Sequence, residues 1–174
     1  TDTMDLLGGD NTVFDASEEA FTNPLPLLTT AELELFEEGD EAFERVWDNG
    51  DGLGPIFNAD SCESCHVEDG RGRPPAFTGE TGTGLLLRLS NTEQTADGFT
   101  FPDIIYGGQF QDDSARNTDS EGTIAISYQE INGTYADGPP YTLMQPIYSL
   151  TDLNYGDVHG LTTISPRLAG QMIG

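Results

Sequence analysis

The chain contains only two cysteines, which lie three positions apart with a histidine directly after the second. They form the segment Cys62-Glu63-Ser64-Cys65-His66. Because residues three apart share one face of a helical turn, both thiols are expected to point the same way. This spacing is typical of c-type haem attachment, in which the thiols form thioethers and the next histidine ligates the iron. We therefore predict one covalently bound haem c, held by Cys62 and Cys65 and ligated by His66.

Three other kinds of site use the same residue types. A redox-active dithiol has this cysteine spacing but does not need the adjacent histidine. A structural disulfide would use the two cysteines alone. A zinc site needs four ligands, and the chain offers only Cys62, Cys65, His66 and His159. Neighbouring ligands at 65 and 66 are awkward for tetrahedral closure, so haem attachment remains the interpretation that we adopt.

A ligating histidine usually holds its second ring nitrogen in a hydrogen bond. The motif is followed by a turn-forming run of glycine, arginine and proline at 69–75. We predict that the carbonyl of Pro74 or Pro75 accepts this hydrogen bond. Haem propionates need positively charged or hydrogen-bonding partners. The candidates are Arg71, Arg73 and Arg88, and the alternative is that these arginines pair with surface carboxylates.

The ligand on the other face of the haem is less constrained by the sequence. Met144 is our first candidate because it lies in an extended segment beside a proline. Met172, His159 and an open position are the alternatives. The choice bears on function, since a methionine ligand raises the iron potential and suits electron transfer. An open position suits reaction with peroxide.

The charge of the chain limits its partners. It has 31 acidic residues and six arginines, without any lysine, for a formal net charge of −25. Nothing neutralises phosphates, which argues against nucleic acid and against an anionic membrane surface. No apolar stretch reaches eighteen residues, so we expect no membrane span. The charge suits a redox partner protein with a basic patch. The alternative is that it serves solubility alone.

Local patterns predict a mainly α fold. Thr29 and Glu32 have capping-box spacing and begin a helix over 29–47, with Gly39 on its apolar face. A second helix is expected at 166–174, begun by Ser165-Pro166 and crossing the first at Gly39. Short strands are expected at 85–90, 101–106, 123–130 and 141–150. We divide the chain into an extended arm at 1–28 and a cytochrome c-like helical haem domain at 29–174, with a β-rich insertion at about 85–155.

The residues around the motif resemble a known family. The matching segments are Gly54 to Ser61, Cys62 to His66, Asp69 to Pro75, Leu85 to Ser90, Tyr106 to Gln109, Tyr135 to Gly138, Leu153 to Gly156, Ser165 to Ala169 and Gln171 to Gly174, with further matches at 8–10 and 12–15. Together they are similar to the bacterial di-haem oxidoreductases, which include thiol oxidoreductases or peroxidases. The resemblance implies a haem cofactor and a c-type cytochrome domain.

Two departures from the family pattern shape the functional expectation. The chain has one haem motif rather than two, and Met144 stands where the pattern tends to have a basic residue. We expect a one-haem electron carrier outside the cytoplasm, periplasmic or at the cell surface, where covalent haem attachment takes place. The alternatives are a fragment that forms the haem domain of a di-haem peroxidase-like oxidoreductase, or a haem-bearing subunit of a larger redox complex. No residue is assigned a catalytic role.

Overall fold

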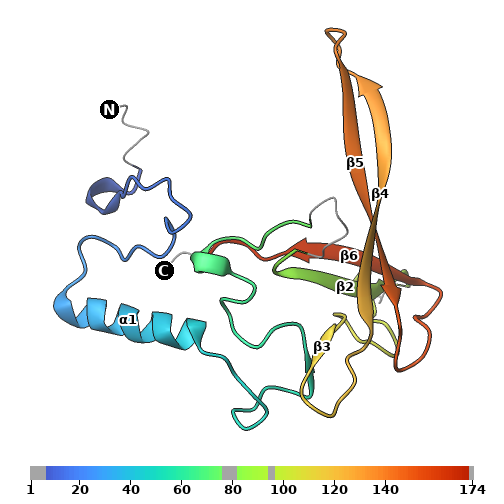
Figure 1. Ribbon diagram of the computed structural model, residues 1–174, viewed down its shortest axis with the longest axis horizontal. Helices are drawn as coiled ribbons and strands as arrows, with labels where there is room; N and C mark the ends of the chain where they lie inside the picture. Colours follow the sequence, from blue (N-terminus) through green and yellow to red (C-terminus); the bar gives the residue numbers. More distant parts are fainter. Residues whose placement is uncertain (1–6, 76–81, 94–96, 173–174) are drawn as a thin grey trace.

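The computed structural model describes residues 7–75, 82–93 and 97–172, and strands predominate among them (Figure 1). The elements are η2 (Gly9–Asn11), α1 (Thr30–Glu44), β1 (Ile56–Phe57), η3 (Val67–Asp69), β2 (Leu85–Asn91), β3 (Asp113–Ser114), β4 (Thr123–Thr134), β5 (Pro140–Thr151) and β6 (Thr162–Leu168). The described residues therefore contain one α-helix and six strands. The prediction of a mainly α, cytochrome c-like fold is wrong.

Helix α1 begins where the sequence predicts. Thr29 is the N-cap, its backbone N–H donates to Glu32 Oε2 at 2.8 Å, and its hydroxyl accepts from the Glu32 N–H at 3.4 Å. The capping box is thus confirmed. The helix ends at Glu44, three residues before the predicted end, because the Trp47 N–H donates to the carbonyl of Asp60 instead of continuing the helical pattern.

The strands form three antiparallel pairs: β1 with β3, β2 with β6, and β4 with β5. Strands β4 and β5 make a long hairpin that projects from the rest of the molecule (Figure 1). The strands predicted at 85–90, 123–130 and 141–150 are confirmed. The segment 101–106 is instead a turn, held by the Asp103 carboxylate, which accepts from the backbone N–H groups of Ile105 and Tyr106.

The helix predicted from Ser165-Pro166 is a strand. In β6, Ser165 pairs with Arg88 and Pro166 pairs with Leu87 of β2. A proline is tolerated there because β6 is an edge strand, where the missing N–H can face away from its partner. Pairing over seven residues outweighs the local helix-start signal. The predicted crossing of two helices at Gly39 is therefore wrong as well.

The buried apolar core is small and lies under β2 and the base of the hairpin. Its members are Leu87, Leu89, Tyr106, Phe110 and Ile124. By contrast, no residue between positions 7 and 69 is buried, and this stretch includes all of α1 and the cysteine motif. The two ends of the molecule thus differ in packing: the strand end has a core of its own, and the helix end does not.

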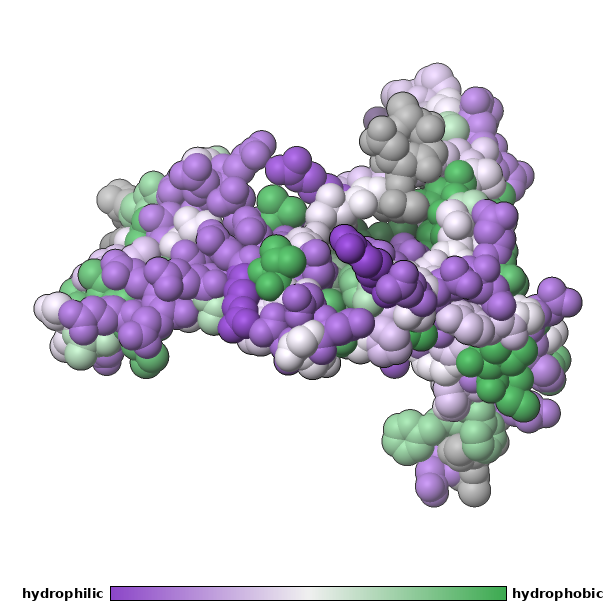
Figure 2. All heavy atoms as spheres, turned by 60° about the horizontal axis from the view of Figure 1, so that its bottom comes forward, coloured by the Kyte–Doolittle hydropathy of each residue, from purple (hydrophilic) through white to green (hydrophobic). Residues whose placement is uncertain are grey.

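The face of the molecule shown in Figure 2 is predominantly hydrophilic, with separate hydrophobic patches. The described part of the N-terminal arm lies against the motif region, where Glu18 pairs with Arg73 at 3.7 Å. The division of the chain at residues 28 and 29 stays a prediction. Among the described residues, no helix combines the length and apolar character needed to cross a membrane.

Candidate haem site

The cysteine motif forms the turn that its spacing predicts. The carbonyl of Cys62 accepts hydrogen bonds from the N–H groups of Cys65 and His66, both at 3.1 Å. Both thiols are free; Cys62 is exposed and Cys65 is partly buried. A third hydrogen bond, from the Ser64 N–H to Ser61 Oγ at 3.0 Å, fixes the start of the turn. The two sulfur atoms are therefore available for bonds to one ligand.

The His66 ring is oriented by the C-terminal segment. Its Nδ1 lies 2.7 Å from the carbonyl oxygen of Gly170, so the neutral ring donates there and leaves Nε2 as its lone-pair nitrogen. Nε2 has no hydrogen-bond partner among the residues that the structure describes. The prediction that Pro74 or Pro75 accepts from this ring is wrong, because the continuation of β6 occupies that position.

The same segment is tied to the region after the motif by backbone hydrogen bonds. The Gly72 N–H donates to the carbonyl of Ala169 at 3.0 Å, and the Met172 N–H donates to that of Asp69 at 2.7 Å. Residues 169–172 therefore run beside residues 69–72. This pairing holds the Gly170 carbonyl against the His66 ring.

Cys65 is packed against the start of β2. Gly84 has a φ of +70°, and a Cβ placed there would lie 2.4 Å from the Cys65 carbonyl oxygen, so only glycine fits. Burial, together with the nearby Asp112 carboxylate and Cys62, raises the pKa of the Cys65 thiol. Redox-active dithiols depend on a lowered thiol pKa. The environment of Cys65 thus does not favour the dithiol alternative.

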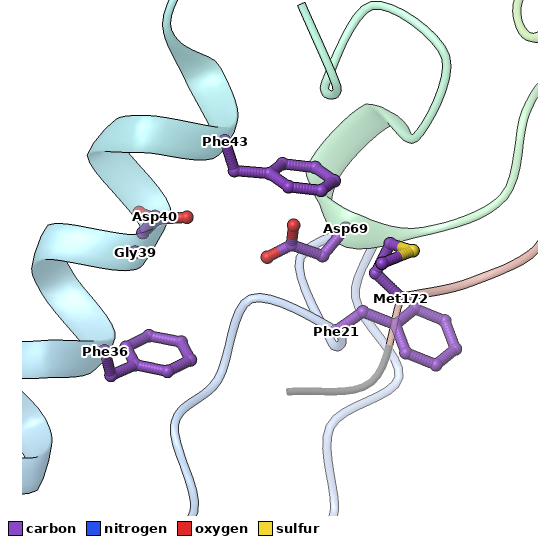
Figure 3. A pocket seen from close by; sticks show the side chains of 7 residues that line it. All are labelled: Phe21, Phe36, Gly39, Asp40, Phe43, Asp69 and Met172. Atoms are coloured by element: carbon purple, nitrogen blue, oxygen red, sulfur yellow. The ribbon is translucent and has the colours of Figure 1, made fainter.

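Helix α1 presents an apolar face to the motif. The Phe43 and His66 rings meet edge to face with centroids 6.1 Å apart, and the Phe43 carbonyl accepts from the Glu63 N–H at 3.4 Å. Beside them lies a cavity of about 250 Å³. Figure 3 shows its lining: Phe21, Phe36, Gly39, Asp40, Phe43, Asp69 and Met172. The aromatic side chains there are only partly covered by protein.

These features fit a large apolar cofactor that contains iron, such as haem. The thiols share one turn, Nε2 of His66 is free to bind a metal, and the adjoining helix buries none of its residues. Burial of such partly covered side chains contributes roughly 25 cal/mol per Å² of apolar surface. Among the described residues, no cluster of three or more histidine, cysteine or acidic side chains is arranged to hold a metal ion.

The candidates for the other axial position lie in different places. Met172 lines the apolar cavity, two residues beyond the carbonyl that binds His66 Nδ1. His159 precedes β6, whereas Gly170 follows it, so the two are separated by the length of this strand, roughly 23 Å. The backbone N–H of His159 donates to Asp103, on the strand side of the molecule.

Met144 lies in the hairpin, paired with Glu130 and 37% exposed. It shares a face with Tyr128, whose hydroxyl donates to the Pro75 carbonyl at 3.4 Å. Met144 is two residues nearer to the hairpin loop than the contact with Pro75. The structure thus brings Pro75 to the hairpin but does not bring Met144 to the cysteine turn.

The three arginines proposed for the propionates are exposed and already have protein partners. Arg71 Nε donates to Gln171 Oε1 at 2.9 Å, Arg73 pairs with Glu18, and Arg88 Nη1 donates to Gln109 Oε1 at 3.2 Å. Their role toward haem stays a prediction.

Two features of the site escaped the sequence patterns. Gly170 carries no side chain and lies far along the chain from His66, so no local motif marks it. Asn58 and Asp112 form the second feature: Asn58 Nδ2 donates to Asp112 Oδ1 at 2.7 Å, and Asp112 lines a cavity with Cys65. The only signal in the sequence was the position of Asn58, a few residues before the motif.

The comparison with known protein families gives a match. The family model described as "Di-haem oxidoreductase, putative peroxidase" matches residues 2–98, which is more than half of the chain and includes the motif. No curated protein and no solved structure gives a match.

Proposed function

Because the chain belongs to the di-haem oxidoreductase family, we propose that it is a haem-bearing domain of a peroxidase-like oxidoreductase. One haem c is attached through Cys62 and Cys65, and His66 ligates its iron. The observation that carries this proposal is the His66 ring, whose Nδ1 is held by the Gly170 carbonyl at 2.7 Å while Nε2 stays available. Such a hydrogen bond fixes the ring and makes its metal-binding nitrogen more basic.

Each residue of the site would then have its own role. Cys62 and Cys65 would hold the cofactor, while the Gly170 carbonyl keeps the His66 imidazole oriented. Phe43 packs edge to face against the imidazole. A bound haem supplies one-electron redox chemistry, whose potential depends on its ligands and on burial.

Two modes of action differ in the second axial position. We infer that this position is open or easily displaced, as a peroxidase needs. His159 lies at the far end of β6, Met144 lies in the hairpin, and Met172 follows the residue that binds the Nδ1 side of His66. These placements support a peroxidase-like role over the one-haem electron carrier expected from the sequence. The electron carrier remains the second candidate because the described chain has one haem motif.

Attachment is tested by producing the protein in cells with a cytochrome c maturation system and measuring the mass of the intact chain. We expect the mass of one haem per chain. Cys62→Ala with Cys65→Ala removes it, whereas Ser64→Ala between the two cysteines keeps it. A wild-type chain without added mass contradicts the proposed function.

Absorption and electron paramagnetic resonance spectra of the loaded protein separate the two modes. An open position predicts a high-spin ferric signal that changes on addition of peroxide and is unaltered by Met144→Ala or Met172→Ala. A low-spin signal that one of these substitutions converts to high-spin identifies a methionine ligand, and would favour the electron carrier instead.

We also propose a site of action outside the cytoplasm and a partner with a basic surface. The net charge of −25 supports attraction of a cationic redox protein. The rate of electron exchange with a cationic acceptor should then fall as salt rises, while that with a neutral dye should change little. Equal salt dependence for both would contradict this partner chemistry.

A further inference from the structure

A second cavity is lined by Cys65 and by no residue of α1. It has a volume of about 390 Å³ and is lined mainly by polar groups, among them Asn58, Asp60, Ser64, Cys65 and Asp112. The cavity thus brings a carboxyl group of the segment after Phe110 to one of the two sulfur atoms that attach the cofactor.

Asp112 ends a chain of hydrogen bonds that runs inward from the surface. Arg88 Nη1 donates to Gln109 Oε1 at 3.2 Å, and Gln109 Nε2 donates to Asn58 Oδ1 at 2.6 Å. Asn58 Nδ2 then donates to Asp112 Oδ1 at 2.7 Å. Every bond in this chain donates toward the carboxyl group. Such a series polarises its members and holds the last acceptor in place.

The pKa of the Asp112 carboxyl group is raised above its ordinary value. Burial raises the pKa of Asp112 and the negative charge of Asp113 adds to this, whereas the hydrogen bonds from Asn58 and from its own backbone oppose it. The ionisable groups that line the cavity from the described segments are Asp60, Asp112, Asp113 and Cys65. Asp113 is exposed, and Cys65 carries no titratable thiol once it is attached.

We propose that Asp112 is a positioning residue that couples proton uptake in this cavity to the oxidation state of the haem attached at Cys65. Asp112 takes one proton from water when a one-electron donor reduces the haem, and returns it when the haem is oxidised. Reduction adds one negative charge close to the carboxylate, so it favours the protonated form; by reciprocity, protonation favours the reduced haem. The inference rests on the proposed function.

Potentiometric titration of the loaded full-length protein between about pH 4 and pH 8 tests this coupling. The wild-type reduction potential should fall as pH rises through the range in which Asp112 loses its proton, and should level off beyond it. Asp112→Asn keeps an acceptor for Asn58 and should make the potential independent of pH in that range. Asp113→Asn removes the neighbouring exposed charge and should keep the dependence, displaced slightly toward lower pH.

A second variant tests whether the result for Asp112→Asn arises only from a change in the local structure. Asn58→Ala keeps the carboxyl group but removes its donor, so the pH range of the dependence should move upward rather than vanish. A loaded wild-type protein with a pH-independent potential, or an Asp112→Asn variant that retains the dependence, overturns the role of Asp112 and leaves the proposed function intact. A chain without attached porphyrin overturns both, which the mass of the same sample reveals.

Discussion

His66 Nδ1 lies 2.7 Å from the carbonyl oxygen of Gly170, a residue 104 positions later in the chain. The motif alone therefore does not complete the site. Its histidine is oriented only when β6 has paired with β2 and residues 169–172 lie beside residues 69–72. Formation of the candidate site thus depends on the pairing of two strands that are far apart in sequence.

Replacement of Gly84 should disturb the site from a distance. Gly84→Ala places a methyl group against the Cys65 carbonyl at a φ of +70°, so we expect a loss of about 2 kcal/mol or more in the free energy of unfolding. Gly160→Ala is the matched control, because a Cβ there meets no atom within 4 Å. Urea unfolding and the yield of attached haem measure both effects. Equal stability of the two variants would contradict the close contact at Cys65.

Substitution of His66 should change the iron without releasing the porphyrin. In those His66→Ala chains that carry haem, the two thioethers remain and the ferric absorption spectrum should change. Added imidazole should restore the wild-type spectrum by taking the empty ligand position. His159→Ala is the control and should leave the spectrum as it is. A His66→Ala spectrum identical to that of the wild type would exclude His66 as ligand.

The N-cap of α1 should control the stability of the helix. Thr29→Ala removes the hydroxyl that accepts from the Glu32 N–H, and such caps contribute about 1 kcal/mol. Thr30→Ala, one residue later, has no part in the capping box and should keep or slightly raise helix content. Far-UV circular dichroism during thermal unfolding compares them. The prediction fails if both variants lose helix content equally.

Protonation of the Asp103 carboxylate should make the protein less stable in acid. Burial acts to raise the pKa of this carboxyl, but hydrogen bonds from Thr162 and from the N–H groups of Tyr106, Ile105 and His159 outweigh it and lower the pKa. The stability that these bonds contribute is present above the unfolded-state value of 3.8 and is lost as pH falls through the lower folded-state pKa.

Asp103→Asn should therefore be less stable than the wild type near neutral pH, and this difference should shrink as the pH falls below about 4. Asp119→Asn, at an exposed position, serves as the control and should follow the wild-type curve. Urea unfolding at a series of pH values measures the difference. A constant gap at all pH values would show that the ionised form of Asp103 has no special role.

Features encoded in short segments could be predicted from the sequence. The cysteine spacing predicted the turn at 62–66, the capping box at Thr29 marked the start of α1, and alternation in 123–130 indicated β4. The C-terminal segment could not be predicted in this way, because Ser165-Pro166 is a local helix signal and its pairing with β2 is not local. The partner of His66 was missed for the same reason: Gly170 acts through a backbone carbonyl, which no side-chain pattern reveals.

The position of Asp112 illustrates a second limit. It stands beside another aspartate, and only the fold distinguishes them, since Asp112 is partly buried against Asn58 whereas Asp113 is exposed. Burial of this kind arises from the packing of segments separated by about fifty residues. A sequence pattern can therefore indicate a haem motif but not which neighbouring carboxyl group shares its environment.

The hairpin and the helix carry very different charge. The strands β4 and β5 contain a single carboxylate, that of Glu130, whereas the fifteen residues of α1 include seven carboxylates and no basic residue. Since these elements lie at opposite ends of the molecule (Figure 1), the electrostatic field of the two elements is most negative at the end that carries α1. A positively charged molecule that diffuses nearby would be attracted by this field. It would first meet the protein on the side where His66 lies.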